Sequence, residues 1–84
     1  MKKNLVTVGK KEGIQSQAAV GLVDIAGKYK CSLWLEQGNK RINAKSLMGV
    51  LSLKLKQGDS FYVTATGDDE TEAFEALSGY ITKA

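Results

Sequence analysis

The segment Asn43-Ala44-Lys45-Ser46-Leu47-Met48-Gly49-Val50-Leu51-Ser52-Leu53 decides how the middle of this chain folds. Serine is favoured at the start of a helix because its hydroxyl accepts a hydrogen bond from a free backbone N–H of the first turn. The apolar residues after Ser46 therefore predict a short helix that begins there and ends before Gln57. The same N–H groups and the positive end of the helix dipole would favour a phosphate on that hydroxyl. Ser46 is thus either a plain cap or a phosphorylation site.

The segments on either side of this helix alternate between strand and helix patterns. β-branched residues and alternating apolar residues predict four strands, at Asn4–Val8, Cys31–Glu36, Lys40–Asn43 and Phe61–Thr66. Apolar residues at helical spacing predict a helix that runs from Ser16 to Gly27 and another that begins at Asp69. In the last helix, Asp69 and Glu72 have the spacing of a capping box. Its buried stripe is expected to consist of Ala73, Phe74, Leu77, Tyr80 and Ile81.

The order of these segments predicts the fold class. A chain of 84 residues is long enough for one domain with one modest core, so we expect a single domain over residues 1–84. Four strands with one apolar face, and three helices to cover it, give an α+β two-layer sandwich with the order β-α-β-β-α-β-α. The connections are compatible with an open-faced sandwich, in which helices cover one face of the sheet.

Composition excludes several classes of function. The chain contains no histidine and one cysteine, so a histidine base and a structural zinc site are excluded, and no metal or cofactor is expected. Because no nucleophile–base pair stands out, an enzyme is not expected either. The 12 basic residues give a net charge of +3, but they are scattered along the chain, which predicts a solvated surface and no direct nucleic-acid partner. No apolar run is long enough for a membrane span, so we expect a cytoplasmic protein, with Cys31 as a small buried thiol.

Three motifs resemble the HPr family, the small phosphocarriers of the bacterial sugar phosphotransferase system. They are Gly13-Ile14 followed by Ala19, the whole segment Asn43–Gly49, and Ala65–Glu70 followed by Ala73. The resemblance covers essentially the whole chain, and the segment around Ser46 is its most specific part. It implies an open-faced sandwich with a four-stranded antiparallel sheet covered on one face by three helices.

The active-site loop departs from the HPr pattern at three positions. Gln15 stands where the family has its phosphoacceptor histidine, and Gln17-Ala18 replaces an arginine–proline pair. A carboxamide has no nucleophilic nitrogen, so phosphotransfer through this loop is chemically excluded. Without the arginine, the loop also lacks the planar cation that would hold a phosphate.

A glutamine at the histidine position is typical of the Crh branch of the family. This resemblance implies phosphorylation of Ser46 by HPr kinase/phosphorylase. The phosphorylated protein would then act as corepressor for a LacI-type repressor such as catabolite control protein A. Crh-type proteins keep the arginine–proline pair, so Gln17 and Ala18 put docking to that repressor in question. The alternative is a phosphorylation-independent adaptor derived from HPr, which binds a metabolic enzyme or another pathway protein.

Two surfaces are candidates for binding. The first is a docking patch beside Ser46. The alternative interpretation is that the same residues only pack against the core or are solvated. These residues are Gln15, Gln17, Val20, Asp24, Lys45, Leu47, Met48 and Leu51. Within it, Lys45 or Lys40 could supply a counter-charge to a phosphate. The second is an apolar strip of Leu5, Trp34 and Tyr62, which strand parity and the HPr-like strand order place on the uncovered face. This strip either stabilises the sheet or mediates self-association, so the chain is expected to be a monomer or a weak homodimer.

Overall fold

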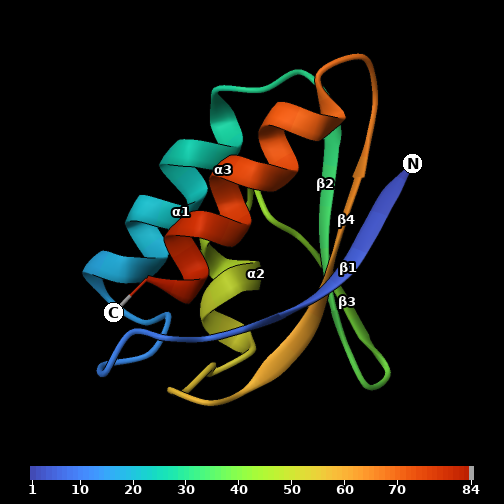
Figure 1. Cartoon of the computed structure of the whole chain (residues 1–84). Helices are drawn as coiled ribbons and strands as arrows, with labels where there is room; N and C mark the ends of the chain where they lie inside the picture. The colour runs from blue at the N-terminus through green and yellow to red at the C-terminus, as the bar shows by residue number, and fades with distance from the viewer. Residues whose placement is uncertain (84) are drawn as a thin grey trace.

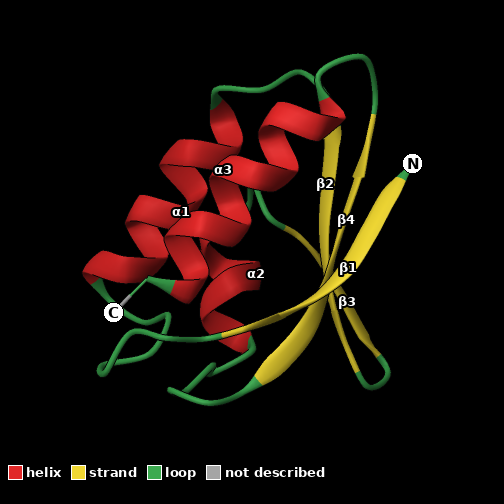
Figure 2. Cartoon of the chain, viewed as in Figure 1, coloured by secondary structure: helices red, strands yellow, loops and turns green. Residues whose placement is uncertain are grey.

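The computed structural model describes residues 1–83, and it shows a sheet with helices packed on one side (Figure 1). Figure 2 shows the two layers, with the helices in red and the strands in yellow. The elements are β1 (Lys2–Thr7), α1 (Gln17–Gly27), β2 (Ser32–Gln37), β3 (Lys40–Asn43), α2 (Leu47–Ser52), β4 (Ser60–Thr66) and α3 (Glu70–Thr82). The predicted class and element order are therefore confirmed, and most predicted bounds lie within two residues of the observed ones.

The sheet is antiparallel throughout, with the strand order β1-β4-β2-β3. β4 and β2 are central, and β1 and β3 form the edges. In the register, Leu5 lies opposite Tyr62, and Trp34 lies opposite Thr64. Alternate residues of each strand point to opposite faces. The parity predicted for β4 is confirmed, because Phe61, Val63 and Ala65 are all buried on the side of the helices.

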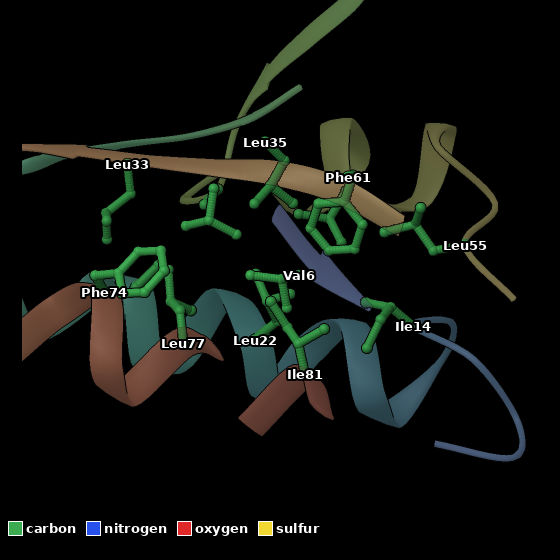
Figure 3. Close-up of a cluster of buried hydrophobic side chains, with 14 of the residues drawn as sticks. Val6, Ile14, Leu22, Leu33, Leu35, Leu55, Phe61, Phe74, Leu77 and Ile81 are labelled. Carbon is green, nitrogen blue, oxygen red and sulfur yellow. The ribbon is translucent and has the colours of Figure 1, made fainter. Parts of the chain in front are cut away.

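The core fills the space between the helices and the sheet (Figure 3). Leu33 and Leu35 of β2 point toward Leu22 of α1 and Leu77 of α3 across this space. Cys31 is buried, as predicted. In α3 the predicted stripe is buried except for Tyr80, which is only half-buried and packs against the rim of the core.

The capping box predicted for α3 is wrong. Asp69 stands at the N-cap, but its carboxylate makes no cap hydrogen bond within the helix. It accepts hydrogen bonds from the backbone N–H groups of Lys30 (2.9 Å) and Cys31 (3.0 Å) instead. Glu70, rather than Glu72, binds back to the turn, where it accepts from the N–H of Gly67 at 3.0 Å. Asp69 thus fastens the segment before β2 to the start of α3.

Candidate functional site

Ser46 caps α2, as its place in the sequence predicts. Its backbone is extended (φ −106°, ψ 112°), and its Oγ accepts a hydrogen bond from the Gly49 N–H at 3.2 Å. Upstream, the Asn43 side chain accepts from the Lys45 N–H at 2.9 Å, which fixes the turn that leads into the cap. The Ser46 side chain is exposed. The hydroxyl is therefore held in one orientation and remains open to solvent.

Gly49 leaves little room beside this hydroxyl. A Cβ at position 49 would stand 3.3 Å from Ser46 Oγ and 3.4 Å from the Cβ of Ile42. The first distance is tighter than most Cβ contacts and the second is at the limit of ordinary van der Waals contact, so a larger residue would press against the cap. The glycine that follows Leu47-Met48 thus keeps the surroundings of the hydroxyl open.

Lys45, which precedes Ser46, makes a hydrogen bond within the chain. Its Nζ donates a 2.7 Å hydrogen bond to the backbone carbonyl of Tyr29, just beyond the end of α1. A cation is favourable at this position because the carbonyl end of a helix is negative. Lys45 therefore links the turn before α2 to the end of α1.

The predicted docking patch is exposed at most of its positions. Met48 is 78% exposed, Val20 is 41% and Leu47 is 37%, while Leu51 is half-buried and packs against the core. α1 and α2 pack against one another, so the exposed apolar residues come from two neighbouring helices. Scattered apolar residues are common on surfaces, but Met48 lies beside the capped serine. Leu51 contributes more to the core than to this patch.

The loop that precedes α1 carries Gln15 and Gln17 at the surface, where both side chains are exposed. Ser16 has φ 50° and ψ −122°, which is an uncommon conformation for a residue other than glycine, and its side chain makes no cap hydrogen bond. Ser16 therefore stands at the N-cap of α1 without a side-chain cap hydrogen bond. The loop is anchored from inside by buried Ile14, whose N–H donates to the Leu55 carbonyl at 3.0 Å.

Asp24 is exposed on α1 and lies on the side of the molecule where Tyr80 packs. Burial raises the pKa of the Tyr80 hydroxyl, and the negative charges of Glu12 and Asp24 raise it further. Asp24 is also the only charged residue of α1. The one charge within this helix is therefore negative, although the chain as a whole is positive.

The open face of the sheet differs from the predicted apolar strip. Leu5 is 57% exposed and Tyr62 is 45% exposed, and these two are direct neighbours. Trp34 is half-buried and lies in the next row of the register, diagonal to Tyr62. Charged side chains interrupt the strip, because Glu36 lies opposite Tyr62 and pairs with both Lys3 (3.3 Å) and Arg41 (3.2 Å). The three residues share a face but do not form one apolar surface.

Among residues 1–83, no group of three or more histidine, cysteine, aspartate or glutamate side chains is arranged to hold a metal ion. No helix of this part of the chain is long and apolar enough to cross a membrane.

The chain is similar to known proteins in both sequence and fold. Residues 2–83 match the family model described as the PTS HPr component phosphorylation site. The HPr-like protein Crh of Halalkalibacterium halodurans is 36% identical over 83 residues, which cover 99% of each chain. HPr-C-His from Thermoanaerobacter tengcongensis superposes with a TM-score of 0.92 at 40% identity, over 96% of this chain and 91% of that one. Crh of Bacillus subtilis, solved as a dimer with a swapped domain, superposes with a TM-score of 0.77 at 37% identity, over 96% and 93% of the two chains.

Proposed function

The chain belongs to the HPr family, and we propose that it is a non-catalytic regulator of carbon catabolite control that receives a phosphate on Ser46. The observation that carries this proposal is the exposed Ser46 hydroxyl, held at a helix start beside the exposed Leu47 and Met48. Relatives named Crh support the assignment to carbon catabolite control. In this proposal the protein acts in the cytoplasm.

In this proposal, a binding partner would contact the negatively charged phosphate directly. Phosphorylation adds about −1.5 to −2 charges, which a helix start tolerates without refolding. The Lys45 ammonium is hydrogen-bonded to the Tyr29 carbonyl, so it would have to leave that partner to bind the phosphate directly. A binding partner would therefore meet the charge together with the apolar side chains of Leu47, Met48 and Val20.

The loop with Gln15 and Gln17 cannot carry the family's histidine phosphotransfer, so the proposal depends on Ser46 alone. With a carboxamide at Gln15 and no histidine in the chain, the family's histidine phosphotransfer has no acceptor. The proposed partners are HPr kinase/phosphorylase, which would add the phosphate, and a LacI-type repressor, which would bind the phosphorylated form. Gln17 and Asp24 would favour a partner surface that is less acidic than the surfaces that bind basic HPr proteins.

The experiment that tests the proposal is incubation of the purified protein with HPr kinase/phosphorylase and ATP, followed by intact-mass measurement. One added phosphate is expected, and Ser46→Ala should abolish it, while Ser52→Ala should not. Ser52 is a matched control because it is an exposed serine of the same helix. No added mass would contradict the proposal and would favour the phosphorylation-independent adaptor. A phosphate that remains in Ser46→Ala would contradict the assignment of the modified residue to Ser46.

A further inference from the structure

The uncovered face of the sheet carries aromatic rings on both of its central strands. Tyr62 projects from β4 and Trp34 from β2, and these strands are direct neighbours. Trp34 lies opposite Thr64, two residues along β4 from Tyr62, so the two rings occupy one diagonal of the face. Diagonal neighbours in an antiparallel pair are about 7–8 Å apart. The two rings are thus close enough to contact successive groups of one extended ligand.

A cation lies beside each ring. The Arg41 guanidinium is 4.2 Å from the centre of the Trp34 ring, and the Lys3 ammonium is 5.1 Å from that of Tyr62. Both cations also contact Glu36, which lies between them. Among the strand residues of this face, the two cations therefore outnumber the acid, which makes the face complementary to an anion. Two of the 12 basic residues, which the sequence alone assigned to a solvated surface, thus meet on this face.

A hydroxyl without a partner lies at the centre of the same face. Thr64 is only 4% exposed, and its Oγ1 has no hydrogen-bond partner among residues 1–83. In the register it lies between Lys3 and Trp34. Buried hydroxyls are nearly always hydrogen-bonded, so an unpaired one within a row of aromatic and cationic side chains indicates that a ligand group could pair with it.

We propose that this face binds single-stranded RNA. Open four-stranded sheets bind RNA by stacking unpaired bases on exposed aromatic rings, while nearby cations contact the phosphates. Here the bases would stack on Trp34 and Tyr62, and Arg41 and Lys3 would turn from Glu36 to the phosphates. With Lys3 displaced, the Thr64 hydroxyl could pair with a ribose 2′-hydroxyl, which DNA lacks. The proposal is independent of Ser46 and of the docking patch.

Trp34 is the only tryptophan of the chain, so its fluorescence reports on this face directly. Titration with a short oligouridylate should quench it saturably. Two phosphate contacts predict a salt slope of about −1.4, which is about a sevenfold loss of affinity between about 50 and 200 mM salt. Oligothymidylate of the same length should bind more weakly. Quenching that rises with protein concentration in the absence of RNA would overturn the proposal in favour of self-association.

Variants, followed by the anisotropy of labelled RNA, separate stacking from simple charge attraction. Trp34→Ala should weaken binding about tenfold, because one stacked base contributes about 1–3 kcal/mol. Trp34→Phe keeps a ring and should retain most of the affinity, which guards against loss of folding as the cause. Glu36→Gln removes the competing acid and should strengthen binding. Arg41→Ala removes a cation proposed to contact the phosphates and should weaken binding. Lys28→Ala removes an exposed cation at the end of α1 and is its control, which should weaken binding much less.

Three further results would overturn the RNA proposal. One is the absence of saturable binding at low salt. A second is equal binding by the wild type and Trp34→Ala, which would reduce the interaction to non-specific charge attraction. The third is weaker or unchanged binding by Glu36→Gln, because the proposal requires Glu36 to compete with phosphate for Arg41 and Lys3.

Discussion

The hydroxyl of Tyr80 occupies the space that a Cβ at Gly21 would need, so α1 and α3 approach one another through a glycine. From this position Tyr80 Oη donates a 2.9 Å hydrogen bond to the carbonyl of Ala18 in the first turn of α1. The Lys10 ammonium lies 4.2 Å from the centre of the same ring. Glycine is unfavourable in a helix interior, but Gly21 leaves room for Tyr80 of α3 to hydrogen-bond the first turn of α1.

Gly21→Ala should therefore destabilise the protein. Alanine is about 1 kcal/mol better than glycine within a helix, but overpacking against Tyr80 typically costs about 1–3 kcal/mol. We expect a net loss, measured as a lower midpoint of urea unfolding. Gly79→Ala in α3 is the matched control, because nothing lies within 4 Å of a Cβ at that position. That variant should gain about 1 kcal/mol. Gains of the same size in both variants would contradict the account of Tyr80.

Asp69 should make the fold sensitive to acid. The Lys30 N–H that donates to its carboxylate, together with hydrogen bonds from Cys31, lowers the pKa of this side chain. A carboxyl group with a lowered pKa in the folded state stabilises the fold above its unfolded pKa, and that contribution is lost as the pH falls through the folded pKa. Asp69→Asn should lower stability at pH 7, because the amide oxygen cannot replace both carboxylate oxygens as acceptors. It should also flatten the loss of stability below about pH 4.

Thermal unfolding measured across the acid range distinguishes these effects. Asp68→Asn is the control, because Asp68 is the neighbouring exposed carboxylate. A parallel loss of stability with falling pH in Asp69→Asn and the wild type would show that Asp69 does not carry this dependence.

The Cys31 thiol should be inert in the folded protein. Burial, and then the neighbouring Asp69 carboxylate, raises the pKa of this thiol to about 11. The thiolate is the reactive form, so hardly any of it is present near neutral pH. Alkylation at pH 8 should therefore be slow in buffer and fast in denaturing urea, as followed by mass spectrometry. Modification at equal rates under both conditions would show that the thiol is accessible.

Most of the fold could be predicted from local patterns, and the places where prediction failed share one physical reason. Alternation in Phe61–Thr66 and the serine before Leu47 act over a few residues, so the sequence displays them directly. Asp69 looks like a local cap, yet its hydrogen bonds reach Lys30 and Cys31, nearly forty positions away. No short-range pattern encodes such a contact.

The candidate site shows the same division. The exposure of Met48 follows from helical spacing, whereas the engagement of Lys45 with Tyr29 depends on how α1 and the turn before α2 meet. The open face likewise needed the register, because Lys3, Glu36 and Arg41 come from three different strands. Gly21 stands inside a predicted helix, but no local pattern identifies Tyr80 as the side chain that packs against it.

The cap at Ser46 can be separated from its proposed modification. Ser46→Ala removes the hydrogen bond to the Gly49 N–H and should destabilise the fold by about 1 kcal/mol, as for other helix caps. Ser46→Asp keeps an acceptor and adds charge at the helix start, so its stability should stay near that of the wild type. Urea unfolding of both variants checks this. Equal destabilisation by Ala and Asp would mean that the cap hydrogen bond does not contribute.

Phosphorylation of Ser46 is tested most directly by the intact mass of the protein after incubation with HPr kinase/phosphorylase and ATP. The account predicts the gain of one phosphate, located at Ser46 by fragmentation and absent from Ser46→Ala, which should remain folded under the assay conditions. An unchanged mass in the wild type, with a genuine HPr phosphorylated in the same reaction, would contradict it.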